Sequence, residues 1–250
     1  MVTSYLGNVI IRILHRIGAQ IQFFWGAIRV VPHRRALLEE LRILGLGSLP
    51  VVIMASMFTG FIATWQVHYL AGDMIGLELL GMMVIKAVFS ELGPMLIGLV
   101  LGGRIGAKVA AEIATMRVTE QIDAMTSLSL NPYRYIVTPR IIAGSIMTPL
   151  LFIYGALVAI VSAQLLATLV FDLAPGVFYN SLRLRYHSAE LVMGLSKSVA
   201  FGIITSVVSS YYGYMASGGA VGVGKATRSA VVATTMAILL ANLILSKVLM

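Results

Sequence analysis

Five long apolar segments dominate this sequence and restrict what the chain can fold into. They cover residues 43–70, 75–103, 141–170, 191–214 and 230–249. Each reaches the roughly 20 residues that an α-helix needs to cross a bilayer. Apolar residues make up 59% of the 250 positions and charged residues 11%, far from the composition of water-soluble proteins. The sequence therefore predicts an all-α integral membrane protein, with one membrane domain over residues 1–250 and no room for a separate catalytic domain.

The N-terminal segment, residues 1–32, predicts an amphipathic helix that lies on the membrane surface. Apolar side chains recur in it at helical spacing, while Arg12 and Arg16 fall on the other side. A spanning helix would bury both arginines near the bilayer centre, which is costly, so an interfacial helix is the better interpretation and a spanning helix the alternative. The repeated arginines and the missing cleavage site argue against a signal peptide.

Basic residues between the spans predict the orientation of the chain. Arg34 and Arg35 precede the first span, and five cations lie between the second and third spans. Loops rich in lysine and arginine stay in the cytoplasm, so we expect a cytoplasmic N-terminus and an external C-terminus. The outer loop with Arg183 and Arg185 is an exception to this rule. The net charge of +8 is better explained by cytoplasmic loops and anionic headgroups than by nucleic acid.

The second span carries charged residues at a depth where hydrocarbon is expected. Ionised groups at that depth normally face a water-filled cavity or pair with an opposite charge. Lys86 and Glu91 are five residues apart, about 140° around a helix, so they make a poor pair with each other. Lys197 in the fourth span is a candidate partner for the acid, or a cation that meets an anionic headgroup. A buried charge pair that fixes helix packing is an equally good interpretation.

The same span contains a helix-breaking sequence, Ser90-Glu91-Leu92-Gly93-Pro94. Pro94 has no amide hydrogen to bond the Ser90 carbonyl, and the glycine lowers helix propensity, so the sequence predicts a kink. Such a kink frees carbonyl groups beside an acid. After this kink the sequence has a small-xxx-small series, Gly98, Gly102 and Gly106, which favours close packing of another helix.

The loop between the second and third spans predicts a short cytoplasmic helix within residues 117–130. Val118, Ile122 and Met125 would share one side of it, and the sequence Asn131-Pro132 would stop it. A short helix between two spans is most often a connector. A cytoplasmic subunit that supplies energy would, however, need such an element as its docking site. The candidate residues for this coupling are Arg117, Thr119, Glu120, Gln121 and Asp123.

Ordered motifs over most of the chain resemble the MlaE-type permeases, the membrane subunits of phospholipid-trafficking ABC transporters that work with MCE proteins. The motifs are Glu91-Leu92-Gly93-Pro94, Gly103-Arg104 with Gly106, Ala111-Glu112-Ile113, Met116-Arg117, Thr119-Glu120-Gln121, Asn131-Pro132, Pro139-Arg140, Lys197-Ser198 and Ala226-Thr227-Arg228.

The resemblance implies a homodimer in a bacterial inner membrane, with five spans per subunit and the C-terminus in the periplasm. It implies a separate cytoplasmic ATPase that binds ATP and magnesium, a periplasmic MCE protein, and a STAS-domain protein as a further candidate partner. It also implies phospholipid transport that serves outer-membrane lipid asymmetry. The substrate path that it implies includes Ser90, Glu91, Lys197, Phe58 and Gln66.

One departure from the family pattern concerns the residue before the acid. Relatives can have a basic residue there, whereas this chain has Ser90. Lys86, one turn earlier, is a candidate replacement for that charge and joins the predicted path.

Three other classes of protein are less well supported. The stretch 219–226 nearly matches a phosphate-binding loop, but Ala226 stands where Ser or Thr would hold magnesium, so it is better interpreted as a cytoplasmic turn. A secondary transporter or channel remains the alternative function, although a single broken helix is evident where inverted repeats would give two. An enzyme or metal site is disfavoured because the chain has no cysteine and its four histidines fall near span ends or in loops.

Overall fold

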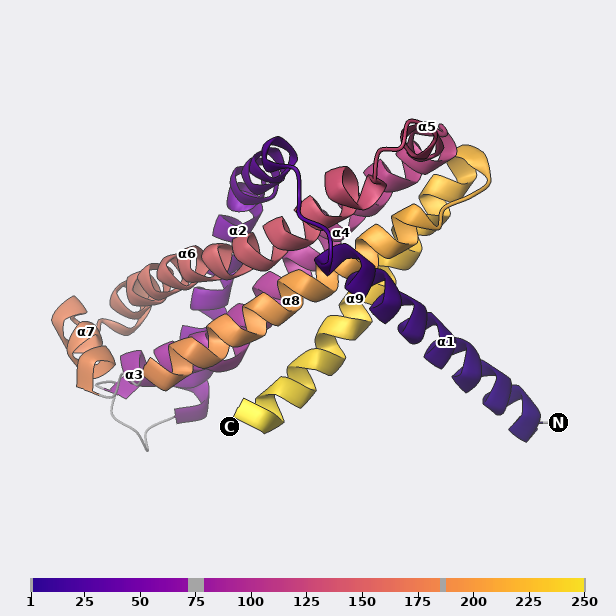
Figure 1. The fold of residues 1–250 in the computed structure, drawn as a ribbon. Coiled ribbons are helices and arrows are strands. Elements are labelled where there is room, and N and C mark those ends of the chain that lie inside the picture. Colours follow the sequence, from indigo (N-terminus) through magenta and orange to yellow (C-terminus); the bar gives the residue numbers. More distant parts are fainter. Residues whose placement is uncertain (1, 72–78, 185–187, 250) are drawn as a thin grey trace.

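The fold is a bundle of long helices, seen here in a computed structural model (Figure 1). The structure describes residues 2–71, 79–184 and 188–249, and these contain no β-strand. The predicted start of the second span and Arg185 lie outside the described residues, as do the side chains of Arg12 and Arg16. In chain order the elements are α1 (Val2–Ile28), α2 (Arg34–Ala71), α3 (Leu80–Ala87), η3 (Val88–Leu92), α4 (Gly93–Val118), α5 (Gln121–Ser127), η4 (Tyr133–Val137), α6 (Thr138–Phe171), α7 (Pro175–Leu184), α8 (Ser188–Tyr214) and α9 (Gly219–Leu249).

Five helical stretches of the described chain are long and apolar enough to cross a membrane, which confirms the predicted fold class. They are Arg34–Leu70, Leu80–Val118, Tyr133–Phe171, Ser188–Tyr214 and Gly219–Leu249. Each is longer than the apolar window that predicted it. The second does not end at residue 103 but continues to Val118, because Ile105, Val109 and Ile113 extend its buried side by one residue per turn.

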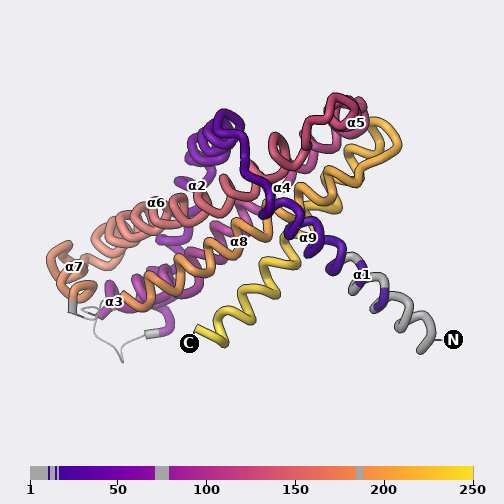
Figure 2. The backbone as a smooth tube through the Cα atoms, in the orientation of Figure 1, coloured from indigo at the N-terminus to yellow at the C-terminus, as the bar shows by residue number. Residues whose placement is uncertain are grey.

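The C-terminal part of helix α1 packs against the bundle (Figures 1 and 2). Phe23 and Ala27 are buried there, and the Thr138 hydroxyl donates a hydrogen bond to the Ala27 carbonyl at 2.9 Å. Trp25 and Ile28 beside them are exposed. The predicted N-terminal helix is therefore present, and its position on the membrane surface stays a prediction.

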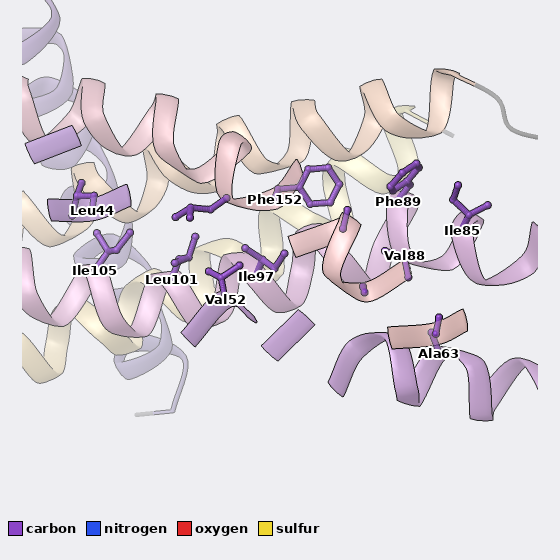
Figure 3. Packing of buried hydrophobic residues seen from close by; sticks show 14 of the residues in the cluster. Leu44, Val52, Ala63, Ile85, Val88, Phe89, Ile97, Leu101, Ile105 and Phe152 are labelled. Carbon is purple, nitrogen blue, oxygen red and sulfur yellow. The ribbon is translucent and has the colours of Figure 1, made fainter. Parts of the chain in front are cut away.

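The core lies where α2, α4, α6 and α8 pack together, around residues such as Val52, Leu101 and Phe152 (Figure 3). Small residues allow very close approach, since a Cβ added to Gly202 of α8 would lie 2.3 Å from the Gly144 carbonyl oxygen of α6. The predicted series Gly98, Gly102 and Gly106 packs against α8 and α9 of the same chain. In a bilayer such tight van der Waals contact is a main source of helix association.

The two ends of the bundle differ in what they carry. Helix α5 lies at one end, and α3 and α7 lie at the other (Figure 1). We call these the α5 end and the α7 end. Because the spans alternate in direction, the first residues of α2, α6 and α9 and the last residues of α4 and α8 all belong to the α5 end.

Candidate functional site

The break predicted in the second span is present as a short π-helix, η3, between α3 and α4. Pro94 stands in the first turn of α4 and offers no amide hydrogen to the Ser90 carbonyl four residues earlier. That carbonyl instead accepts a hydrogen bond from the Lys197 ammonium of α8 at 2.8 Å. The sequence break thus frees a backbone oxygen, and a charged side chain from another span uses it. π-Helical turns of this kind are often found at functional sites.

Lys197 lies at the centre of a polar cluster within the spans. Its side chain has 0% exposure, and its Nζ atom lies 2.6 Å from Glu91 Oε1 and 2.8 Å from Ser246 Oγ, as well as 2.8 Å from the Ser90 oxygen. An ammonium group has three hydrogens to donate, and these three acceptors match them. A buried charge with an opposite charge and a full set of hydrogen bonds is a stable arrangement in an apolar surrounding.

Glu91 is the fourth member of the cluster and lies at its edge. Its Oε1 accepts from Lys197 and from the Ser246 hydroxyl at 2.7 Å, while Oε2 accepts from the Asn242 amide at 3.2 Å. Its side chain is 32% exposed, in contrast to that of Lys197. The carboxylate is thus partly accessible, as are Asn242 and Ser246, and we find Lys197 buried and paired rather than free to meet a headgroup.

Asn242 and Ser246 are site residues that the sequence analysis missed. They lie four positions apart on α9, so both face the same side of that helix. A polar pair with this spacing in the last apolar span is the signal that could have found them. Together they connect α9 to the break in the second span.

Three predicted path residues lie away from this cluster. Lys86 is exposed on α3, and Phe58 and Gln66 are exposed on α2. Within the described part of the chain, no hydrogen bond or ion pair joins any of them to Glu91. The structure thus brings together Ser90, Glu91 and Lys197 of the predicted path and leaves the other three on outward faces.

The predicted coupling residues gather at the corner between α4 and α5. Arg117 forms an ion pair with Asp123, and the Gln121 amide donates to the Thr119 hydroxyl at 3.0 Å. Glu120, Gln121 and Asp123 are exposed. We call this segment, residues 117–123, the α4–α5 corner.

The predicted helix 117–130 is wrong in its extent. Arg117 and Val118 are the last residues of α4, and helix α5 covers only Gln121–Ser127. The physical reason is the backbone, since Glu120 and Ser129 adopt left-handed conformations with φ of 60° and 57°, which an α-helix does not contain. Ile122, only 1% exposed, anchors the short helix to the bundle.

The stretch that resembled a phosphate-binding loop is helical in the structure. Helix α9 begins at Gly219, so residues 219–226 form its first two turns and not the flexible turn that we expected. A phosphate-binding loop needs a strand before it and an open loop of backbone amides, and helix α8 precedes this segment instead. Among the described residues, no group of three or more His, Cys, Asp or Glu side chains could hold a metal ion.

Comparison with known proteins agrees with this architecture. The family described as Permease MlaE matches residues 37–248. The chain belongs to the MlaE permease family. This MlaE-family chain is similar to a probable ABC transporter permease protein of Rickettsia prowazekii, with 37% identity over 211 residues, 84% of the chain and 82% of the relative.

Two further relatives of this MlaE-family chain are also probable ABC transporter permease proteins. The one from Rickettsia felis is 34% identical over 250 residues, 98% of the chain and 96% of the relative. The one from Synechocystis is 34% identical over 219 residues, 86% of the chain and 81% of the relative. The similarity thus covers nearly the whole fold and includes η3, α5 and α9.

Proposed function

We propose that this chain is the membrane-spanning permease subunit of an ABC transporter, that it moves phospholipid, and that a separate ATPase subunit drives it. The family match and the names of the relatives support the permease role. The observation that carries the proposed substrate is the polar cluster of Glu91, Lys197, Asn242 and Ser246, because it is held between apolar spans and shows a carboxylate at its edge.

A phospholipid needs apolar walls for its acyl chains and polar groups for its headgroup. The spans supply the walls, since α2 and α9 expose apolar side chains such as Met54, Ile62, Met236 and Leu240. The cluster supplies polar groups at a position where an unpaired charge would be costly. An amphipathic substrate suits both features, because its acyl chains can lie against the apolar faces and its headgroup can lie at the polar cluster.

The α4–α5 corner is the proposed docking site for the ATPase. Its polar side chains are exposed, while Ile122 ties the corner to the bundle and Arg117 lies 5.8 Å from the centre of the Tyr214 ring. A partner that presses on this corner therefore acts on both α4 and α8. Because Arg34, Arg35 and Arg117 belong to the same end, we propose that the α5 end faces the cytoplasm of a bacterial inner membrane.

The remaining partners follow from the family resemblance. We propose a homodimer with a lipid cavity between its two subunits, open towards a periplasmic MCE protein, and a STAS-domain protein as an accessory subunit. In this arrangement the C-terminus is periplasmic, ATP and magnesium bind to the partner ATPase, and this chain carries no cofactor of its own.

The test is to purify the chain from its native membrane in mild detergent and identify bound subunits and lipids by mass spectrometry. We expect an ATPase and phospholipid to be retained by the natural sequence. Glu120→Ala should reduce ATPase retention without changing bound lipid. The double variant Glu91→Gln with Lys197→Met removes both charges of the cluster together and should change lipid retention without releasing the ATPase.

Arg35→Gln serves as a control, because this exposed cation lies outside both the cluster and the corner. A preparation without any ATPase, or one whose lipid content is the same for the double variant and the natural sequence, would contradict the proposal.

A further inference from the structure

A second group of charges lies near the α5 end, apart from the polar cluster. Arg140 of α6 is 6% exposed, and its Nη2 atom lies 3.0 Å from Glu40 Oε1 of α2 and 3.2 Å from Glu112 Oε2 of α4. Its Nη1 atom donates to the Ile136 carbonyl at 2.9 Å. One guanidinium group thus joins three helices.

The two carboxylates that share Arg140 differ in environment. The side chains of Arg140 and Glu40 are 7% and 11% exposed, so separating them would leave two charges poorly hydrated. The Glu112 side chain is 38% exposed, and its second oxygen lies 3.7 Å from Lys108 Nζ, one turn earlier on α4. Glu112 can therefore leave Arg140 for water and Lys108, whereas Glu40 cannot leave at a comparable cost.

Glu112 is also connected directly to the α4–α5 corner, because it and the first corner residue, Arg117, belong to the continuous helix α4. It precedes Arg117 by five residues on the same helix, about 7.5 Å along the axis. A helix segment of that length moves as one piece, so a displacement of the corner also displaces Glu112. Arg140, held by Glu40, stays with α2 and α6.

We propose that Glu112 exchanges between Arg140 and Lys108 during the transport cycle, and that Arg140 is the positioning residue that transmits movement of the α4–α5 corner to α2 and α6. When Glu112 binds Arg140, the three helices are joined at this end. When it turns to Lys108, α4 is free to shift while Arg140 keeps Glu40 as its counter-ion. This exchange rests on the proposed function, in which an ATPase moves the corner.

The functional test uses the permease reconstituted with its ATPase in phospholipid vesicles, and compares lipid transferred with ATP hydrolysed. Glu112→Gln removes the exchanging charge and should lower lipid transfer about tenfold at a nearly unchanged ATPase rate, a typical size for coupling between two sites. Lys108→Gln leaves Glu112 with Arg140 as its partner, so the joint stays closed and transfer per ATP should fall several-fold. Glu39→Gln, an exposed acid beside Glu40, is the matched control and should behave as the natural sequence.

If Glu112→Gln does not fold, Lys108→Gln still tests the exchange. The Lys108 side chain is 42% exposed, so its replacement leaves the packing intact. A natural transfer-to-ATP ratio in Lys108→Gln would overturn the exchange. A parallel fall of transfer and ATPase rate in Glu112→Gln would also overturn it, since that result indicates a structural contact alone.

A distance measurement separates this inference from the proposed substrate. The chain has no cysteine, so spin labels at Thr115→Cys on α4 and Arg134→Cys beside α6 are the two thiol-linked probes in the chain. In the complex with its ATPase, we expect their separation to change when a non-hydrolysable ATP analogue is added, and this change should be lost with Lys108→Gln. An unchanged separation in the natural sequence would overturn the exchange even if lipid transfer is observed, whereas a changed separation without lipid transfer would refute only the substrate.

Discussion

Lys197 of α8 and Glu91 of η3 are 106 positions apart in the sequence and form an ion pair of 2.6 Å in the membrane-spanning part of the fold. The two residues differ in exposure, since the lysine side chain is fully buried and the glutamate side chain is 32% exposed. The pair connects the break in the second span to the fourth span, and Ser246 extends the connection to the fifth.

This difference in exposure predicts unequal costs for breaking the pair. Glu91→Gln leaves Lys197 as a buried charge without a counter-ion, which should destabilise the protein by about 3–5 kcal/mol. Lys197→Met leaves Glu91 with access to water, so its cost should be smaller. Thermal unfolding in detergent would measure both, and the double variant should be more stable than Glu91→Gln alone. Equal losses for the two single variants would show that burial does not control the energy of this pair.

Glu120 has a left-handed backbone conformation, which allows a contact between its carboxylate and the ATPase to be tested apart from its role in shaping the turn. Glycine adopts this conformation without strain, so Glu120→Gly should relieve about 1 kcal/mol while it removes the carboxylate. If the carboxylate contacts the ATPase, this variant binds the ATPase more weakly although the permease unfolds at a higher temperature. Natural binding affinity in a pull-down or calorimetric titration would mean that Glu120 only shapes the turn.

The crossing of α6 and α8 should tolerate no added methyl group. A Cβ on Gly202 would lie 2.3 Å from the Gly144 carbonyl oxygen and 2.8 Å from the Thr148 hydroxyl, so Gly202→Ala should cost about 1–3 kcal/mol. Gly224→Ala on α9 is the matched control, because a Cβ there meets nothing within 4 Å. It should leave stability unchanged or raise it by up to about 1 kcal/mol. Equal melting temperatures for the two variants would contradict the observed packing.

The sequence predicted the number and type of the spans because apolar length is a local property. It also predicted the break at Pro94 and suggested Lys197 as a partner for Glu91, since a charge in hydrocarbon requires an explanation. It could not predict Asn242 and Ser246 as part of this cluster, because their role depends on how α9 packs against the break. Their spacing of four residues marks a polar face on α9, but the partner of that face is set by tertiary structure.

The ends of two predicted helices also differ from those in the structure. The second span was expected to end at residue 103 because Arg104 and Lys108 suggested a loop, yet long basic side chains can lie at the surface of a regular helix. The predicted coupling helix missed the left-handed residue Glu120 for a different reason. A non-glycine residue in that conformation has no reliable signature in one sequence.

The proposed orientation can be tested with single cysteines, because the natural chain has none. Asn180→Cys lies on α7 and Ser129→Cys lies in the turn after α5, and both positions are exposed. In cells whose outer membrane is permeable, an impermeant thiol reagent should label Asn180→Cys directly and Ser129→Cys only after the inner membrane is opened. The reverse pattern would place the α4–α5 corner in the periplasm, where no ATPase could dock.

The most direct test of the whole account is ATP-driven phospholipid transfer by the purified permease, with and without its ATPase, in sealed vesicles that contain a fluorescent lipid. We expect transfer that requires both subunits and ATP, and that decreases with Glu120→Ala. Transfer at the same rate by the permease alone would contradict the central claim that this chain forms the lipid passage and depends on a partner for energy.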